Sequence, residues 1–355
     1  MLKYLPYIKH FFIKNFPVEI TFLVTSRCNA RCSHCFYHRD INVKKDELSL
    51  EEIKKIFSDF GPLLRVSISG GEPFIREDIV ELTRLIYNYS KPPHITIPTN
   101  GILTDRIINS VKGILDYCRA ATINVGISLD GLGEQRDKIM GVEGSFDKSM
   151  DTYFRLKESK KSFRNFILGV VLTQTYSNQR DIEKIYEFAK DELKPDNIAF
   201  SLVRGSSRDE EEMNIDINIF KKMVEKIKKD NFQGRFPFWK IFAWQRNVVY
   251  HYVAEAYEKN KYLLPCYSGR IRIILTPEGD VYPCEILMLK DRDRFKLGNL
   301  RDCDYKIRKI YNSDRYREIN NFIKDSRCFC RHECDLTTNF FFNPHLLLKQ
   351  YLHQL

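Results

Sequence analysis

Three cysteines near the start of the chain, Cys28, Cys32 and Cys35, are spaced C-x3-C-x2-C. Thiolates at this spacing in one loop can point at a common metal centre, and three ligands leave a fourth coordination position open. In a catalytic zinc site that position holds water, whereas on a four-iron cluster it leaves one iron free for a substrate or cosubstrate. The alternatives are a structural zinc knuckle and free cysteines. Four basic or ionisable neighbours favour the thiolate form: Arg27, Arg31, His34 and Arg39.

A second group of five cysteines lies near the other end of the chain. Two of them bracket a strand–turn–strand pattern that contains RIRIILTPEGDVYPC, where the PEGD run around Gly279 predicts a hairpin. The other three follow in the run CFCRHEC. Such spacings indicate a metal site, and a zinc ribbon is one alternative. Cys118 and Cys303 stand apart and are expected to be ordinary buried or free cysteines. The group consists of Cys266, Cys284, Cys328, Cys330 and Cys334.

Between the two groups, short runs rich in Val, Ile or Phe alternate with longer helical patterns, which predicts parallel βαβ units. Ser49 and Thr104 are predicted helix N-caps. The polar stretch 205–215 is expected to be an exposed loop. Strands are predicted at 18–24, 65–69, 94–98, 122–128, 166–172 and 197–202. Helices are predicted at 50–60, 78–88, 105–117, 145–159, 181–193 and 217–229.

These elements place four motifs at one edge of the predicted sheet. TSRCNARCSHC follows the first strand, SGGEP the second, PTNG the third and SLDG the fourth. Because α/β barrels carry their chemistry at the carboxyl ends of the strands, the alignment predicts an open-position metal site at the mouth of a barrel. Arg204, which closes the sixth strand, either contacts a carboxylate or phosphate or forms a surface salt bridge.

The composition excludes several classes of protein. The 355 residues are 43% hydrophobic and 29% charged, with a net charge of +10, which is an ordinary globular balance. No run of about eighteen apolar residues and no signal-peptide cleavage pattern occurs, so a cytoplasmic protein is expected. In that compartment ten cysteines indicate metal ligands or reactive thiols rather than disulfides. Basic and acidic residues are intermixed, so nucleic-acid binding is not expected.

Both ends of the chain are amphipathic. In MLKYLPYIKHFFIKNF, Leu5, Ile8 and Phe12 lie along one side and basic residues along another, and the tail HLLLKQYLHQL is similar. These ends either pack on the barrel as closing helices or lie on an anionic membrane surface. The second alternative would add a peripheral membrane contact and admit a lipid-linked substrate.

The cysteine loop, together with Gly70–Pro73, resembles the radical S-adenosylmethionine (SAM) enzymes over most of the chain. The resemblance implies an α/β fold with a partial (β/α)6 TIM-like barrel, in agreement with the independent strand count. It implies that Cys28, Cys32 and Cys35 hold a [4Fe–4S] cluster whose fourth iron is chelated by the methionine part of SAM. One-electron reduction, by a partner such as flavodoxin or ferredoxin, then yields a 5′-deoxyadenosyl radical that abstracts hydrogen from a substrate.

The resemblance also implies that six residues bind SAM. Glycine backbone lets the methionine moiety lie close, Glu72 supplies a carboxylate for its amino group, and proline fixes the turn. His34 stands where the family usually has an aromatic residue near adenine; the alternative is a solvated loop histidine. Arg136 and Met140 replace a His and an Arg that often follow SLDG in the family, which leaves the specificity of this loop open. The six are Gly70, Gly71, Glu72, Pro73, Asn100 and Ser128.

The second cysteine group resembles the C-terminal SPASM or twitch domain, where a β-hairpin and a short helix hold one or two auxiliary iron–sulfur clusters. A full SPASM domain has seven cysteines and two clusters, so the five here favour one auxiliary [4Fe–4S] cluster bound by four of them. The spare ligand among Cys328, Cys330 and Cys334 is left open. An auxiliary cluster can ligate the substrate or accept an electron, and either role suits oxidation or cross-linking.

The predicted function is a radical SAM oxidoreductase or maturase that modifies a peptide or protein side chain by oxidation, cross-linking or epimerisation. One alternative is the same chemistry on a small molecule or lipid, giving dehydrogenation or C–C bond formation, and another is a non-catalytic iron–sulfur or zinc scaffold. No catalytic side chain is identified. The predicted organisation is an N-terminal amphipathic segment (1–17), a radical SAM core (18–230), a helical connector (231–262), a SPASM/twitch-like auxiliary-cluster domain (263–340) and a C-terminal helix (341–355).

Overall fold

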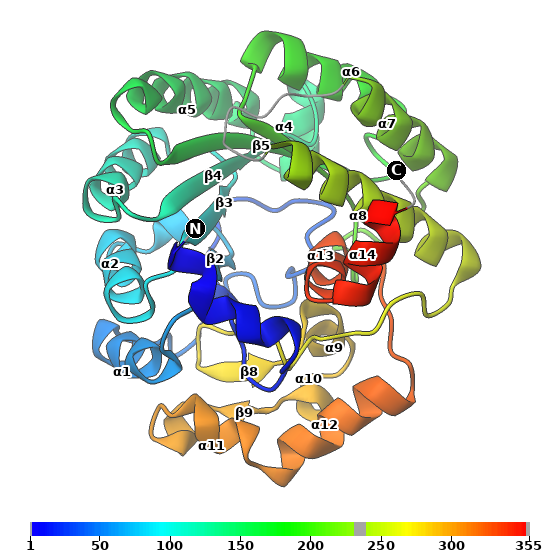
Figure 1. The fold of residues 1–355 in the computed structure, drawn as a ribbon. Coiled ribbons are helices and arrows are strands. Elements are labelled where there is room, and N and C mark those ends of the chain that lie inside the picture. Colours follow the sequence, from blue (N-terminus) through cyan, green and yellow to red (C-terminus); the bar gives the residue numbers. More distant parts are fainter. Residues whose placement is uncertain (1, 231–238, 353–355) are drawn as a thin grey trace.

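A single nine-stranded sheet runs through the chain, in the order β6-β5-β4-β3-β2-β1-β7-β8-β9. The computed structural model describes residues 2–230 and 239–352. Neighbouring strands from β6 to β7 are parallel, and the helices surround them in a ring (Figure 1). The sheet is open, with β6 at one edge and β9 at the other, so the predicted α/β partial barrel is confirmed. The bounds are β1 Glu19–Thr25, β2 Arg65–Gly70, β3 His94–Thr99, β4 Thr122–Ser128, β5 Phe166–Gln174, β6 Asn197–Leu202, β7 Arg272–Leu275, β8 Asp280–Tyr282 and β9 Gly298–Asn299.

The six predicted strands are all present, with ends shifted by at most two residues. All seven residues of β1 are buried, because helices cover the outer face of the sheet and side chains fill its inner face. Strands of this kind read as continuous apolar runs in the sequence, which is why they could be located.

The outer helices carry apolar stripes that pack on the strands. Ser49 caps α1 in a capping box with Glu52, as predicted. Thr104, in contrast, is the first residue of α3 and not its N-cap; its hydroxyl accepts a hydrogen bond from Thr152 (2.8 Å). The helices are α1 Leu50–Phe60, α2 Ile79–Ser90, α3 Thr104–Tyr117, α4 Glu134–Met140, α5 Ser145–Ser159, α6 Ile182–Phe188, which continues as the π turn η4 Ala189–Leu193, and α7 Ile217–Lys229.

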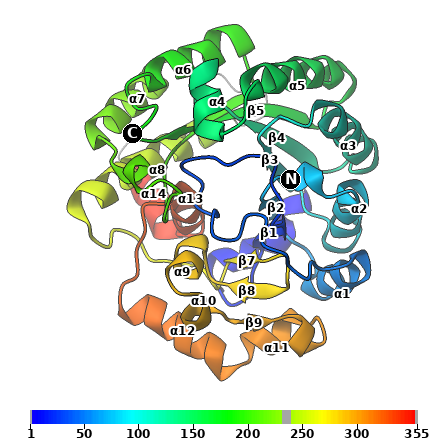
Figure 2. The ribbon, with the colours of Figure 1, turned by 180° about the vertical axis from the view of Figure 1, so that it is seen from behind.

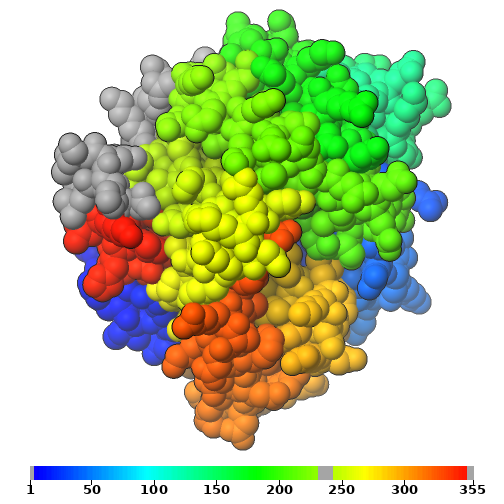
Figure 3. All heavy atoms as spheres, turned by 90° about the vertical axis from the view of Figure 1, so that its right-hand side faces the viewer, coloured from blue at the N-terminus to red at the C-terminus, as the bar shows by residue number. Residues whose placement is uncertain are grey.

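The C-terminal part grows out of the same sheet, because β7 pairs with β1 and forms the predicted hairpin with β8. Gly279 has φ +92° in the hairpin turn, a conformation that favours glycine. Helix α8 covers the edge of β6, where the Tyr250 hydroxyl accepts a hydrogen bond from the Phe200 amide (2.9 Å), and Figure 3 shows its yellow end between green helices and orange segments. The helices are α8 Trp239–Lys259, α9 Glu285–Lys290, α10 Arg292–Phe295, α11 Ile307–Tyr311, α12 Asp314–Asp325, α13 Glu333–Phe341 and α14 Pro344–Leu352. Of the predicted connector, residues 231–238 lie outside the described part of the chain.

The N-terminal segment forms a 3-10 helix, η1 (Leu2–Phe11), that packs on the barrel. The Tyr7 hydroxyl donates to the Leu63 carbonyl (2.8 Å), and the Phe11 ring lies 5.3 Å from that of Phe342. The N-terminal segment therefore packs on the barrel, and Leu346 and Leu347 of α14 are half-buried against the core, as the closing-helix alternative predicted. No helix in the described part of the chain is long and apolar enough to cross a membrane.

Candidate active site

The loop between β1 and α1 carries the first three cysteines and lies in the middle of the ring of elements (Figure 2). All three thiols are half-buried. Burial raises the pKa of Cys28 to about 11, with Glu72 and Cys35 adding to the effect. Burial also raises the pKa of Cys32, with Cys35 and Cys28 as the next contributors. The three thiols therefore influence one another within one loop, although among the described residues their sulfur atoms do not all lie within 4.8 Å of one another.

Backbone contacts hold this loop in place from two directions. The Arg31 amide donates to the Met140 carbonyl and the Ser33 amide to the Ile139 carbonyl, both at 2.9 Å, so the end of α4 supports the loop. The Asn42 side chain accepts from the Cys28 amide (2.9 Å) and donates to the Cys28 carbonyl (3.0 Å). These hydrogen bonds therefore fix the backbone of the loop that carries the three thiols.

The stretch 205–215 is exposed only in part, as at Asp209, Glu210 and Glu211, and its buried side packs on the cysteine loop. Glu212 is only 2% exposed, and its carboxylate accepts hydrogen bonds from the Ser33 and Ser177 hydroxyls. The Asp209 amide donates to the Ser33 carbonyl (2.9 Å). The polar composition was misleading because these groups are satisfied by the loop they support.

The glycine pair at the end of β2 is required by the chain's own backbone. A Cβ on Gly70 would lie 2.4 Å from the Thr25 carbonyl oxygen, and one on Gly71 would lie 2.1 Å from that of Arg27. The Gly71 amide donates to the Thr25 carbonyl and the Glu72 amide to the Arg27 carbonyl, both at 2.9 Å. The glycines therefore let the cysteine loop lie against β2, a role that the sequence did not indicate.

The Glu72 carboxylate is 1% exposed and is already occupied by protein donors. It accepts hydrogen bonds from the Thr99 hydroxyl (2.8 Å), the Asn100 amide (2.8 Å) and the Phe74 amide (3.2 Å). Burial raises its pKa to about 7, although these hydrogen bonds act in the opposite direction. Pro73 opens the short 3-10 helix η2 (Pro73–Ile75), so the turn is fixed as predicted. Glu72 ties this turn to the end of β3.

Asn100 and Ser128 stand at the carboxyl ends of β3 and β4, as predicted, and Arg136 joins them. Its Nη2 donates to the Asn100 carbonyl (2.7 Å) and the Ser128 carbonyl (3.1 Å), while Nη1 donates to the Ser145 carbonyl (2.7 Å). The Asn100 side chain donates to Asn29 in the cysteine loop (2.8 Å). Arg136 is fully buried, so it positions both strand ends. In the sequence it stands five residues after SLDG, within a helical pattern that does not by itself indicate burial.

His34 is half-buried rather than solvated. Its Nε2 lies 3.4 Å from a carboxylate oxygen of Asp130 at the end of β4, and its side chain is 14% exposed. Burial lowers the pKa of His34, but the carboxylates of Asp130 and Glu212 outweigh it and the pKa is raised overall. The solvated-loop alternative for His34 is therefore wrong.

Four cysteines of the second group come together. Burial raises the pKa of Cys284, and the thiols of Cys266 and Cys330 raise it further. Burial also raises the pKa of Cys330, and the thiols of Cys266 and Cys328 add to that increase. Cys266, Cys328 and Cys330 line one small pocket beside Leu264. Cys284 follows the hairpin as the N-cap of α9. Four thiolates are the number of protein ligands that one [4Fe–4S] cluster takes.

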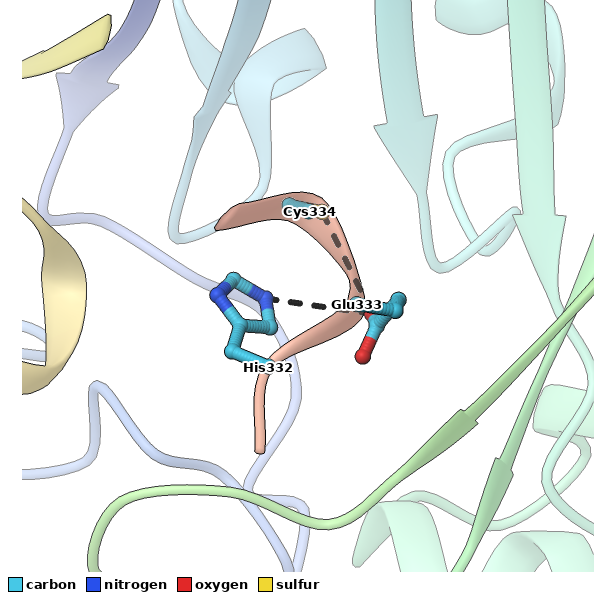
Figure 4. Close-up of side chains that lie close together, drawn as sticks. All are labelled: His332, Glu333 and Cys334. Atoms are coloured by element: carbon cyan, nitrogen blue, oxygen red, sulfur yellow. Dashed lines mark hydrogen bonds and ion pairs between the residues drawn. The ribbon is translucent and has the colours of Figure 1, made fainter. Parts of the chain in front are cut away.

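Cys334 lies among different neighbours. Its thiol, one oxygen of Glu333 and one nitrogen of His332 are all within 4.8 Å of one another (Figure 4). Burial raises the pKa of Cys334, but His332 and Arg272 outweigh it, so the pKa is lowered overall. The pKa values of the other four thiols of this group are raised instead. Cys303 is half-buried and Cys118 is buried.

Arg204 connects the two cysteine groups. Its guanidinium lies over the Phe36 ring (4.4 Å), directly after Cys35. It also pairs with Glu285, beside Cys284, at 3.0 Å and with Glu333 at 3.6 Å. Arg204 thus forms an internal ion-pair network and not a surface salt bridge, and it lies between the two cysteine groups.

The comparisons with known proteins match two separate parts of the chain, and each part contains one of the cysteine groups. Residues 22–189 match the radical SAM superfamily and residues 266–335 match the iron–sulfur cluster-binding SPASM domain. The Fe-coproporphyrin III synthase of Methanosarcina barkeri is 33% identical over 214 residues, which are 58% of this chain and 50% of that protein. AlbA, the antilisterial bacteriocin subtilosin biosynthesis protein of Bacillus subtilis, is 27% identical over 305 residues, which are 84% of this chain and 60% of that protein.

Among solved structures, Streptococcus suis SuiB bound to SAM is similar to this chain, with a TM-score of 0.63 and 20% sequence identity. The match covers 87% of this chain and 68% of the SuiB chain. The chain belongs to the radical SAM superfamily. Within that superfamily it is a SPASM-domain protein, which confirms the predicted resemblance and cofactors: a [4Fe–4S] cluster, SAM and an auxiliary iron–sulfur cluster. The chain spans about half the length of the M. barkeri relative.

Proposed function

We propose that this enzyme abstracts hydrogen from a peptide or protein side chain held between the two cysteine groups. The observation that carries the proposal is Arg204, which touches Phe36 on one side and Glu285 and Glu333 on the other. A substrate that reaches this residue is near both metal centres. SAM bound at the first centre supplies a radical that removes the hydrogen, and the second centre suits acceptance of the remaining electron.

Two relatives support a peptide substrate. AlbA is named for bacteriocin biosynthesis and matches most of this chain, and another SuiB structure holds the precursor peptide SuiA. The products would be oxidised, cross-linked or epimerised side chains. A low-potential donor such as flavodoxin or ferredoxin would reduce the first cluster.

For the first cluster we propose Cys28, Cys32 and Cys35 as ligands, with SAM lying along the SGGEP turn and the ends of β3 and β4. Gly70, Gly71, Pro73, Asn100 and Ser128 remain its proposed contacts. For Glu72 we propose a changed role: its carboxylate fixes the turn against β3, and the backbone of the turn meets the methionine moiety. This assignment follows from the three hydrogen bonds that already engage the carboxylate.

For the auxiliary centre we propose one cluster held by Cys266, Cys284, Cys328 and Cys330, with Cys334 as the spare cysteine. The support is the pocket that Cys266, Cys328 and Cys330 line and the different contacts of Cys334, whose thiol groups with His332 and Glu333.

The second candidate substrate is a small acidic molecule. Arg204 pairs only loosely with Glu333 (3.6 Å), so a substrate carboxylate can replace this partner. The M. barkeri relative, named for a porphyrin that carries carboxylates, supports this alternative. A non-catalytic scaffold is the remaining alternative.

The test is 5′-deoxyadenosine formation by the anaerobically reconstituted protein with SAM and a strong reductant. If the wild type produces the nucleoside and Cys28→Ala does not, the result supports a radical enzyme. If iron-loaded wild-type protein produces none, even with the candidate peptides and porphyrin carboxylates present, the result supports a non-catalytic scaffold. Deuterium transfer from labelled peptides or from labelled porphyrin carboxylates into the nucleoside then separates the two substrate classes.

A further inference from the structure

An exposed apolar patch occupies the outer side of η1 and the residues after it. Leu5, Ile8, Phe12 and Ile13 are 56%, 51%, 76% and 56% exposed. With Tyr4 they make up five of the eleven large hydrophobic side chains that are exposed in the described residues, and they fall within ten positions. Scattered exposed apolar residues are ordinary, but a concentration of this kind marks an interaction surface.

The patch is held outward by contacts on the opposite side of the segment. Tyr7 is buried and bonded to the Leu63 carbonyl, and the Phe11 ring packs 5.3 Å from that of Phe341. The Lys14 ammonium donates to the Phe11 carbonyl (2.6 Å). The exposure of the apolar side chains is therefore a property of the docked segment.

The patch lies at the amino end of the barrel. The Tyr4 hydroxyl is 3.0 Å from a ring nitrogen of His94, the first residue of β3. Figure 1 shows η1 in front of the sheet, whereas in Figure 2, from behind, the cysteine loop is nearer the viewer. The patch and the candidate active site thus face opposite ways.

The loops at this end of the barrel are basic, whereas exposed acidic residues occur where the neighbouring helices end: Asp116, Glu158, Asp191 and Glu192. The loops that lead into parallel strands all lie at the amino edge of the sheet. In the loops before β3 to β6, Asp196 is the one acidic residue, and it is buried and paired with Lys160. No acidic residue occurs in the sequence at 1–18 or 336–355. The exposed basic residues of the loops are Lys91, Arg119, Lys161, Arg164 and Lys194.

We propose that this end of the barrel docks on the surface of an anionic lipid bilayer. Leu5, Ile8 and Phe12 enter the boundary between headgroups and acyl chains, and the basic loops lie over the acidic headgroups. The charge distribution decides against a second copy of this chain, because two such faces would repel each other. Docking in this way leaves the candidate active site turned toward the aqueous side, where it receives a water-soluble substrate.

The proposal goes beyond the proposed function and is tested without substrate or SAM. The full-length protein is sedimented with vesicles of phosphatidylcholine alone or mixed with phosphatidylglycerol. We expect binding to the mixed vesicles only, and its loss at about 1 M salt, where the Debye length is about 3 Å. Phe12→Glu should lower the partition coefficient at least about tenfold, because an apolar anchor is replaced by a charge.

Matched controls separate the face from general effects. Phe154→Glu alters another exposed phenylalanine (49%, against 76% for Phe12) on the flank of the barrel and should bind like the wild type. Lys194→Glu should weaken binding several-fold, whereas Lys54→Glu, on an outer helix, should not. Absence of wild-type binding, or undiminished binding by Phe12→Glu, overturns the proposal. A wild-type dimer that Phe12→Glu dissociates, without vesicle binding, would assign the face to a second copy instead.

Discussion

The two cysteine groups of this protein are assembled in opposite ways. Cys28, Cys32 and Cys35 lie in one loop that β2, α4 and the segment after β6 support. The auxiliary group draws its thiols from the start of a hairpin, its end, and the segment between α12 and α13. One site is therefore local in sequence, and the other exists only once distant segments have packed.

The difference separates what spacing can predict from what it cannot. Three ligands within one loop are constrained by the chain itself, so their number and spacing identify the site. In the auxiliary group, Cys330 and Cys334 both follow Cys328 within one short run but meet different neighbours, because α13 begins between them. Which of these cysteines is a ligand therefore depends on how the chain folds and not on the spacing alone.

The largest expected effect is at the local site. Cys32→Ala removes one of three ligands from the loop, and a cluster held by two cysteines loses its stable coordination. We expect SAM cleavage to fall to background and about four irons per chain to be lost. Iron analysis and chromatography of 5′-deoxyadenosine measure both. Cys303→Ala, at a half-buried cysteine outside both groups, is the control and should retain both properties; full cleavage by Cys32→Ala would refute the assignment.

The next effect concerns the distant site. Cys330→Ala should remove about four irons while leaving some SAM cleavage, because the first cluster has its own ligands. Cys334→Ala should keep the full iron content, since its thiol faces His332 and Glu333. Iron and sulfide determination on the two variants side by side is sufficient. If Cys334→Ala loses iron and Cys330→Ala does not, the ligand assignment is reversed.

Much of the fold could be predicted, because fully buried parallel strands produce apolar runs and their helices produce amphipathic ones. The site was predicted at the level of cysteines and strand ends, which the motifs mark directly. The supporting residues could not be found this way. Arg136 is a charged residue in an ordinary helical pattern, and only burial against two strand ends shows its role. Glu212 looked like part of an exposed acidic run until the fold placed it against Ser33.

A smaller effect tests the close packing of the cysteine loop against the end of β2. Gly71→Ala places a methyl group 2.1 Å from the Arg27 carbonyl oxygen, and neither backbone segment can move without displacing Cys28. We expect a loss of about 2–4 kcal/mol in the free energy of unfolding, by analogy with other overpacked sites. Gly133→Ala, at φ +51° with open space around it, is the matched control and should lose about 1 kcal/mol. Equal losses in chemical denaturation would show that the close approach is not required.

The smallest effect concerns the charge of Glu72. Its folded-state pKa is raised to about 7 from 4.5, mainly by burial, so the folded chain keeps a proton that the unfolded chain releases as the pH rises. The stability that this proton provides is complete below about pH 4.5 and is lost as the pH rises through about 7, by up to about 3 kcal/mol. Glu72→Gln should lack this slope in denaturation of the cluster-free chain.

Glu52→Gln is the control for that slope, because the Arg301 hydrogen bond lowers the pKa of Glu52 to about 2, outside the window. Parallel pH profiles for the wild type and Glu72→Gln would mean that the Glu72 carboxylate is ionised at neutral pH. An ionised carboxylate could attract the amino group of SAM directly, as the resemblance implied. A sloping wild-type profile would instead indicate a proton shared within the turn, with Glu72 acting through the position it gives to the SGGEP backbone.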